Sequence, residues 1–263
     1  MSKKLHYMSL WLAVIFSVEC YGLDSIAHRG LSSSIQENTI DAIQGAWKAG
    51  ADIVELDVRI LSDHTLVLFH DDNIEGRRID SLTYDIIQSL TPDYHIPTLR
   101  EAFDACSPEQ SLLLDLKDSS KEFIDCLLAE LTANSGRGPR LLLQSSVIDV
   151  LNALKYNLQT PTLLFVTSLN RNGLLMRIPD PKKLSLWLKD NQLAGVTAKG
   201  RGFIDREFVR SFQEKDLLFY VWTINSSDRI SYYRDIGVDG IISDYPELVP
   251  VDAVIEKSEQ GNG

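Results

Sequence analysis

The sequence predicts an α/β fold, a closed (β/α)8 TIM barrel, on three observations. Short apolar segments typical of strands alternate with amphipathic helical patterns along most of the chain. The length of 263 residues is close to that of a single-domain α/β barrel. The composition, 44% hydrophobic and 24% charged, is that of an ordinary globular protein. A doubly wound open sheet is the structural alternative.

Each strand-like segment is followed by its own helical pattern. The expected strands are 24–28, 52–58, 111–117, 140–145, 162–166, 194–199, 217–223 and 239–243. The expected helices are 39–49, 99–105, 119–133, 146–156, 181–190, 205–215, 226–235 and 246–256. Two connections are long. Residues 59–98 contain an extra strand at 65–69 and a short helix at 81–90, and residues 167–180 form a polar loop.

The first 22 residues have the layout of a secretory signal peptide, which leaves 23–263 as the barrel domain. Lys3 and Lys4 precede an apolar stretch over 8–18, and Cys20 and Gly22 are small residues at the expected positions for cleavage after Gly22. The apolar stretch is too short for an easy membrane span, although an uncleaved anchor is the alternative. We therefore expect an exported protein, periplasmic or secreted.

The net charge limits the classes of ligand, and the cysteine content bears on a possible disulfide. A formal net charge of −11 disfavours nucleic acid as a ligand. It would also repel an anionic substrate unless a local cation cluster or a metal reversed the field. Cys106 and Cys126 remain after cleavage, and an oxidising compartment permits a disulfide between them without requiring one.

Polar residues collect where the expected strands end. Glu55 and Asp57 lie two apart in a β-branched strand and so face the same side. Their alternative interpretation is a solvated strand edge. Asp115 and Lys117 repeat the spacing on the next strand, and the carboxyl ends of parallel strands meet at one mouth. Converging carboxylates repel one another unless a hard divalent cation with oxygen ligands, Ca²⁺ or Mg²⁺, lies between them.

Histidines and basic residues accompany these acids. His28 ends the first strand and His70 ends the extra strand, where a pair of imidazoles suits proton transfer in both directions. Arg29 and Lys117 are suited to bind a phosphate, and their alternative role is salt bridging to the same carboxylates. The other histidines, His64 and His95, are interpreted as turn or loop residues. Asn38 is interpreted as a helix N-cap, which does not exclude a role in orienting a ligand group.

Longer motifs give a family resemblance over nearly the whole chain after the signal. The segments "AHRG" (27–30), "ENT" (37–39), "GADIVELDV" (50–58), "LVLFHDD" (66–72), "IPTLREAF" (96–103), "VWTIN" (221–225) and "GVDGIISDYP" (237–246) resemble the glycerophosphodiester phosphodiesterase family in order and spacing. The combination is specific, whereas no single piece would be.

The resemblance implies a barrel enzyme that hydrolyses small-molecule glycerophosphodiesters to glycerol 3-phosphate and an alcohol, with membrane contact compatible but not required. It implies a set of site residues: metal ligands Glu55, Asp57 and Asp115, histidines His28 and His70, phosphate-contacting Arg29 and Lys117, and pocket-lining Trp222. For Trp222, a place in the barrel core is the alternative. Asp115 departs from the usual glutamate, which puts direct metal contact there in doubt.

The implied mechanism passes through a cyclic phosphate, with His28 favoured as the acid and His70 as the base. Two other functions stay open. One is a lysophospholipase D or sphingomyelinase D-like enzyme acting on lipids, to which the apolar residues of 172–179 would contribute. The other is a non-catalytic barrel that binds a phosphorylated ligand.

Overall fold

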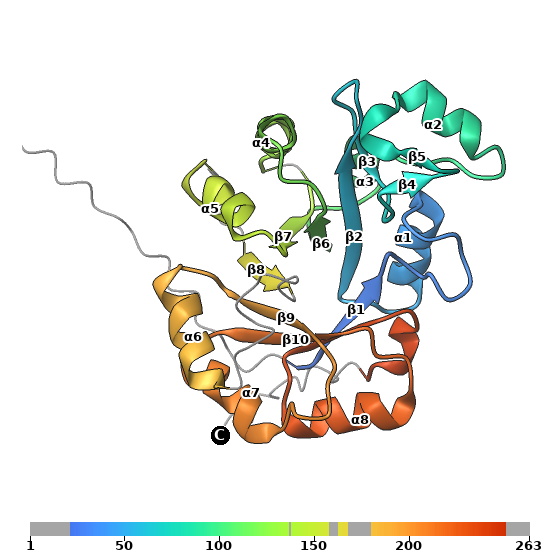
Figure 1. The fold of residues 1–263 in the computed structure, drawn as a ribbon. Helices are drawn as coiled ribbons and strands as arrows, with labels where there is room; N and C mark the ends of the chain where they lie inside the picture. Colours follow the sequence, from blue (N-terminus) through green and yellow to red (C-terminus); the bar gives the residue numbers. More distant parts are fainter. Residues whose placement is uncertain (1–21, 137, 158–162, 168–179, 251–263) are drawn as a thin grey trace, which may run out of the picture.

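A closed parallel barrel forms the centre of the molecule (Figure 1). The computed structural model describes residues 22–136, 138–157, 163–167 and 180–250. The barrel strands are β1 (Asp24–His28), β2 (Ile53–Ile60), β6 (Ser111–Leu116), β7 (Arg140–Ser145), β8 (Leu163–Thr167), β9 (Gly195–Lys199), β10 (Leu218–Trp222) and β11 (Gly240–Ser243). Each pairs in parallel with its neighbours in chain order, and β1 closes the ring by pairing with both β2 and β11. The predicted barrel is confirmed, and the open sheet is excluded.

Helices cover the outside of this ring. They are α1 (Ile40–Lys48), α3 (Leu99–Asp104), α4 (Lys121–Ala133), α5 (Ile148–Asn157), α6 (Pro181–Asp190), α7 (Arg206–Gln213) and α8 (Ser227–Ile236). Side-chain caps fix several starts; Ser120, for example, accepts the amide N–H of Phe123 at the start of α4. The helix predicted over 246–256 is wrong in its first turn, because Pro246–Leu248 form a 3₁₀ turn. Residues 251–256 lie outside the described part.

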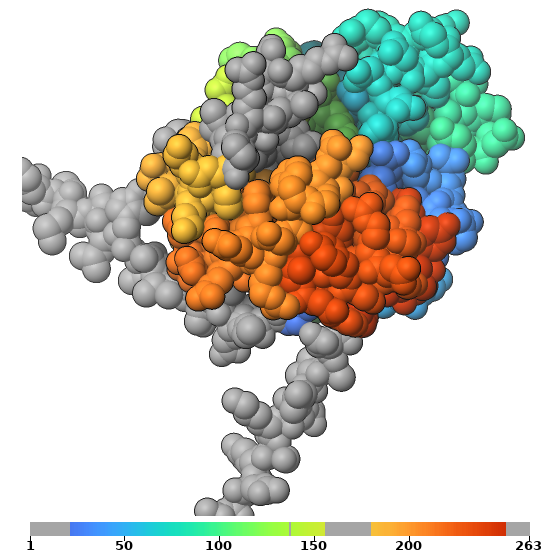
Figure 2. All heavy atoms as spheres, turned by 60° about the horizontal axis from the view of Figure 1, so that its bottom comes forward, coloured from blue at the N-terminus to red at the C-terminus, as the bar shows by residue number. Residues whose placement is uncertain are grey.

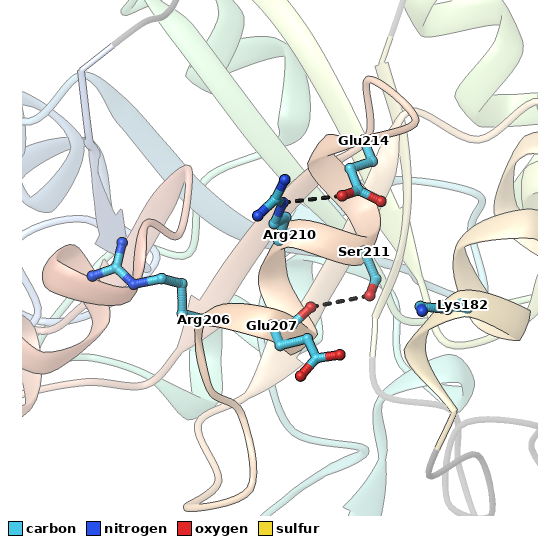
Figure 3. A pocket seen from close by; sticks show the side chains of 6 residues that line it. All are labelled: Lys182, Arg206, Glu207, Arg210, Ser211 and Glu214. Carbon is cyan, nitrogen blue, oxygen red and sulfur yellow. Dashed lines mark hydrogen bonds and ion pairs between the residues drawn. The ribbon is translucent and has the colours of Figure 1, made fainter.

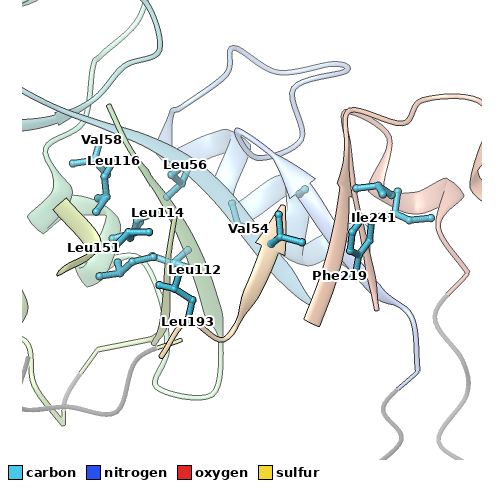
Figure 4. Close-up of a cluster of buried hydrophobic side chains, with 14 of the residues drawn as sticks. Val54, Leu56, Val58, Leu112, Leu114, Leu116, Leu151, Leu193, Phe219 and Ile241 are labelled. Carbon is cyan, nitrogen blue, oxygen red and sulfur yellow. The ribbon is translucent and has the colours of Figure 1, made fainter. Parts of the chain in front are cut away.

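Alternating side chains give the barrel two apolar layers. Outward residues of β2 and β6 pack beneath the helices (Figure 4), among them Val54, Leu56, Val58, Leu112, Leu114 and Leu116. A smaller cluster fills the lumen and consists of Ile26, Ile53, Leu113, Leu142, Tyr220 and Ile242. Each buried leucine or isoleucine contributes about 1.5–3 kcal/mol of hydrophobic stabilisation. Since Ile53 faces the lumen, Glu55 and Asp57 face it too, as the period of two predicts.

The long connection after β2 builds a small lobe beside the barrel, coloured cyan in Figures 1 and 2. β3 (Leu66–Leu68) pairs antiparallel with β2, and α2 (Tyr84–Leu90) lies close to the predicted short helix. Two elements were not predicted, the hairpin of β4 (Asn73–Ile74) with β5 (Arg77–Arg78) and the 3₁₀ turn Ile79–Ser81. The lobe has its own apolar cluster of Leu61, Val67, Ile79, Leu82, Ile87 and Ile96.

Three other predictions concern segments away from the barrel. Residues 1–21 of the expected signal peptide and residues 168–179 of the polar loop lie outside the described part. No helix within the described ranges is long and apolar enough to cross a membrane. Cys106 and Cys126 are free thiols, so the disulfide that the composition permitted is not formed here.

Candidate active site

The strand register brings the predicted carboxylates together at the carboxyl end of the barrel. His28 lies opposite Glu55 in the β1–β2 ladder, and Asp57 lies opposite Asp115 in the β2–β6 ladder. One carboxylate oxygen from each of Glu55, Asp57 and Asp115 lies within 4.8 Å of the others. Glu55 is 3% exposed and Asp57 is 1% exposed. The three acids therefore converge in the lumen, and the solvated-edge interpretation is wrong.

Two cations partly balance this cluster. Lys117 Nζ lies 2.9 Å from Asp57 Oδ1 and 2.6 Å from Asp115 Oδ2. Arg29 Nε lies 3.2 Å from Asp57 Oδ2, while its Nη1 donates to both carboxylate oxygens of Glu37 at 2.9 Å. The salt-bridging role left open for Arg29 and Lys117 is thus present in this structure.

Glu55 is the acid that these cations leave unbalanced. Its Oε2 accepts the backbone N–H of Arg29 at 3.0 Å, and among the described residues no cationic side chain forms an ion pair with it. Burial, followed by the charge of Asp57, raises the pKa of Glu55 to about 8. Arg29 adopts a left-handed backbone, with φ of 58°, to direct its N–H there.

The two neighbouring acids differ in how far nearby cations offset the effect of burial on their pKa values. Burial alone would raise the pKa of Asp57, but Lys117 and Arg29 hold it below its usual range. Burial raises the pKa of Asp115, and Lys117 offsets part of that effect. A buried set of oxygen donors with one unbalanced carboxylate is the donor chemistry that fits a hard divalent cation. Glu55, Asp57 and Asp115 therefore fit such an ion.

Asn38 fixes Asp57 in place, which is the orienting role that the sequence left open without naming the partner. Its amide donates to Asp57 Oδ2 at 2.9 Å, and its carbonyl oxygen accepts the Asp57 backbone N–H at 3.1 Å. Asn38 is buried and has a left-handed φ of 57°. The predicted N-cap role is wrong, because Thr39 caps α1 by accepting the Ala42 N–H. The "ENT" motif held the signal, but its residue pairing is visible only in three dimensions.

His28 is held by an aspartate from the opposite end of the chain. Its Nδ1 lies 2.6 Å from Asp244 Oδ1. Asn225 donates to Asp244 Oδ2 at 2.5 Å and accepts the Asp244 backbone N–H at 3.0 Å, while Ser32 donates to Oδ1 at 3.2 Å. Burial lowers the pKa of His28, but the bond to Asp244 together with the charges of Glu55 and Asp244 more than offsets it, so the pKa is raised. Nδ1 is engaged, and Nε2 remains for proton exchange.

His70 has a more open setting. Its side chain is 37% exposed, and Nδ1 lies 2.8 Å from Asp71 Oδ1. Its backbone oxygen accepts two hydrogen bonds from the buried guanidinium of Arg59, at 3.0 and 2.8 Å. Among the described residues its imidazole hydrogen-bonds only to Asp71. The structure thus fixes the backbone at His70 without joining its ring to the carboxylate cluster.

The histidines interpreted as turn and loop residues occupy such positions. His64 is exposed with a left-handed φ of 66°, and His95 is exposed with Nε2 3.1 Å from Glu101. Both belong to the connection between β2 and α3. Neither contacts the carboxylate cluster among the described residues.

Trp222 borders the mouth on the far side from the acids. It ends β10, packs on the lumen cluster and is half-buried, so both interpretations given for it hold in part. Its indole Nε1 is buried and finds no hydrogen-bond partner among the described residues. Lys199, which ends β9, has its Nζ 6.0 Å from the centroid of the Trp222 ring. Lys199 was not among the predicted site residues.

A separate hollow of about 440 Å³ lies between α6 and α7 on the outside of the barrel (Figure 3). Its lining is Lys182, Arg206, Glu207, Arg210, Ser211 and Glu214. Arg210 Nε donates to Glu214 at 3.0 Å, and the Ser211 hydroxyl donates to the Glu207 backbone oxygen at 3.0 Å. These contacts pair Arg210, Glu214 and Ser211 within the hollow, and no predicted site residue lines it.

Comparisons with known proteins show which family this chain belongs to. The family model described as the glycerophosphoryl diester phosphodiesterase family matches residues 28–248. The chain is 30% identical over 252 residues to glycerophosphodiester phosphodiesterase 1 of Bos taurus, covering 81% of this chain and 75% of that protein.

Two solved structures share the architecture. A glycerophosphodiester phosphodiesterase from Thermotoga maritima is 25% identical, with a TM-score of 0.70 over 87% of this chain and 97% of that one. An Oleispira antarctica phosphodiesterase, solved with the product sn-glycerol-3-phosphate, is 23% identical, with a TM-score of 0.72 over 87% and 95%.

Proposed function

Because the chain belongs to the glycerophosphoryl diester phosphodiesterase family, we propose that it hydrolyses glycerophosphodiesters to glycerol 3-phosphate and an alcohol. One observation carries the proposal: the buried trio of Glu55, Asp57 and Asp115 lies beside His28 and two basic side chains at the barrel mouth. The product named in the Oleispira antarctica structure supports the same chemistry.

Glu55, Asp57 and Asp115 would hold one divalent cation, Ca²⁺ or Mg²⁺. When bound, the ion supplies positive charge to the phosphoryl oxygens during the reaction. The unbalanced charge of Glu55 is the reason for assigning the ion to this position. Asp115 Oδ2 is already bonded to Lys117, so Asp115 would contact the ion through its other carboxylate oxygen or through a bridging water.

Arg29 and Lys117 are the phosphate-binding groups in this proposal. Both point at the cluster and carry fixed positive charge, which suits a phosphodiester anion. Substrate phosphate would replace part of their present contacts with Glu37 and Asp115. Their charge then stabilises the additional negative charge on phosphorus-bound oxygen in the transition state.

His28 and His70 divide the proton transfers. His28, held by Asp244, gives the Nε2 proton to the departing alcohol oxygen. His70 accepts the proton of the glycerol 2-hydroxyl, whose oxygen attacks phosphorus as the P–O bond to the alcohol breaks. Water then opens the cyclic phosphate with the two histidine roles reversed. An analogue that lacks the 2-hydroxyl should therefore be nearly inert, because the attacking group is absent.

A lysophospholipase D activity keeps one observation in its favour. Phe203, in the loop that follows β9 at the mouth, is 65% exposed, and an exposed aromatic ring there suits an acyl chain. The apolar residues of 172–179 on which the sequence argument relied lie outside the described part.

We also propose that the protein is exported. Amino-terminal sequencing of the native protein tests this proposal, and we expect the mature chain to start near Leu23.

One assay separates these functions. Glycerol 3-phosphate release is measured from glycerophosphocholine, bis(glycerol)phosphate and lysophosphatidylcholine, before and after chelation and after return of Ca²⁺ or Mg²⁺. We expect release from the water-soluble diesters that chelation abolishes and metal restores. Release from the lysolipid alone would favour the lipid enzyme. Binding without release from any of them would favour the non-catalytic barrel.

A further inference from the structure

Lys199 is fixed at the mouth by the backbone around it. The β9–β10 ladder pairs Lys199 with Trp222, and the next amide, Gly200 N–H, donates to the Trp222 carbonyl at 2.9 Å. A side chain at Gly200 would place its Cβ 2.5 Å from Ile224 Cδ1, so neighbouring side chains would have to shift to admit one. Val196 packs outward into the main core, which puts Lys199 on the lumen side of the strand with Thr197.

The ring of strands places Lys199 across the mouth from the carboxylates. β9 stands four positions from β2 in the closed ring, on its opposite side. Arg29 and Lys117 lie on the carboxylate side and form ion pairs with acids there. Lys199 is exposed and forms no ion pair within the described ranges. Its charge is therefore available to whatever part of a substrate extends away from the phosphate site.

Lys199 also occupies a place that a cationic headgroup would otherwise use. Its ammonium lies 6.0 Å from the Trp222 ring centroid, at the edge of cation–π range. Quaternary ammonium groups bind aromatic faces of this kind. A choline or ethanolamine group entering here meets a positive charge first, whereas glycerol or another uncharged alcohol does not.

From these contacts we propose that Lys199 selects the substrate's alcohol group, favouring diesters of uncharged or anionic alcohols over those of choline and ethanolamine. The inference rests on the proposed function and narrows its substrate class. It requires the alcohol group to lie on the Trp222 side of the mouth, beside Lys199, because only the alcohol differs in charge between these substrates. Lys199 is thus a specificity residue and has no part in bond breaking.

The test compares kcat/KM for bis(glycerol)phosphate and glycerophosphocholine. We expect the wild-type protein to favour the glycerol diester about fivefold, the effect of unit charges a few ångströms apart in a wet site. Lys199→Met should bring this ratio to about 1 by raising turnover of the choline diester, and Lys199→Glu should invert it. Raising the salt from about 0.05 to 0.5 M should narrow the wild-type ratio.

The control is Lys189→Met, which removes the same charge from the last turn of α6, away from the mouth. It should leave the ratio as in wild type. An unchanged ratio in Lys199→Met would overturn the inference, as would an equal loss on both diesters, which would assign Lys199 to the phosphate.

Calorimetric titration of both diesters into chelated protein supplies a readout that needs no turnover. If the affinity ratio depends on Lys199 and the metal-loaded protein hydrolyses neither diester, the inference would hold and the proposed function would be overturned. Hydrolysis with a ratio that ignores Lys199 would do the reverse.

Discussion

Carboxylates lie at both ends of the barrel, but the two ends use them differently. At the amino-terminal end, Asp24 accepts the Tyr220 hydroxyl at 2.7 Å. Beside it, Asp52 accepts the Ser25 backbone N–H at 2.9 Å, and Asp239 accepts the Phe219 backbone N–H at 2.8 Å. Each of these acids thus has a donor that belongs to the fold itself.

At the carboxyl end, the acids depend on one another and on shared cations. Asp57 and Asp115 share Lys117, and Glu55 has a single backbone donor. Burial raises the pKa of Asp24 to about 6 and that of Glu55 to about 8, so a raised pKa occurs at both ends. What distinguishes the mouth is convergence: its carboxylate oxygens point at a common point in the lumen, beside a histidine and two basic groups. A perturbed acid indicates a functional site only when its neighbours supply the rest of the chemistry.

The largest expected effect comes from Glu55→Gln or Asp57→Asn, which remove charge from the cluster with little change in shape. Each should reduce kcat by at least about 10²–10³-fold, because charge stabilisation at the reacting phosphate is lost. Asp239→Asn at the opposite end, which changes a half-buried acid, is the control and should leave kcat unchanged. Equal losses at the two ends would mean that the mouth acids serve stability alone.

The next effect concerns the histidines. His28→Ala and His70→Ala should each reduce kcat by at least about 10²-fold, the usual contribution of general acid–base catalysis. His64→Ala and His95→Ala are the controls, since both residues lie on the lobe without contact to the cluster. A loss at His64 equal to that at His70 would contradict the placement of the base.

Asp244→Asn tests how His28 is held. We expect a decrease in kcat of about tenfold or more with little change in KM, because an amide holds the imidazole less firmly and no longer stabilises its charged form. Removing that stabilisation should also lower the pKa of His28, so the alkaline limb of the pH–rate profile, where the proposed acid loses its proton, should move to lower pH. Asp71→Asn, beside the exposed His70, should shift the profile less.

The features of the fold and site that follow a regular sequence pattern were predictable from the sequence. Strand positions followed from apolar runs, and the shared face of Glu55 and Asp57 followed from the period of two. Asp244 was missed as a partner of His28 because 216 residues separate them and only barrel closure brings β11 beside β1. For Asn38 an orienting role was left open, but its partner Asp57 was not found because a local N-cap explained the residue equally well. Lys199 lies in no quoted motif, so only its register with Trp222 reveals it.

Asp24→Asn, at the amino-terminal end, should leave kcat unchanged. The substitution should instead change the free energy of unfolding. The pKa of Asp24 is about 6 in the folded protein and 3.8 in its ordinary state. Between these values the folded protein binds more protons than the unfolded chain, so the free energy of unfolding decreases as the pH rises.

The asparagine side chain of this variant stays neutral at every pH, and its oxygen can still accept the Tyr220 hydroxyl. The variant should therefore lack this decrease, and its stability relative to wild type should grow by up to about 3 kcal/mol between pH 4 and pH 7. Urea unfolding of both proteins at the two pH values measures the difference. Tyr220→Phe sharpens the test: it removes the hydrogen bond that favours the charged form of Asp24, so the decrease should extend to higher pH. A stability difference that does not change with pH would mean that the pKa of Asp24 in the folded protein is that of an exposed acid. Burial would then not raise the pKa of the acid at this end of the barrel.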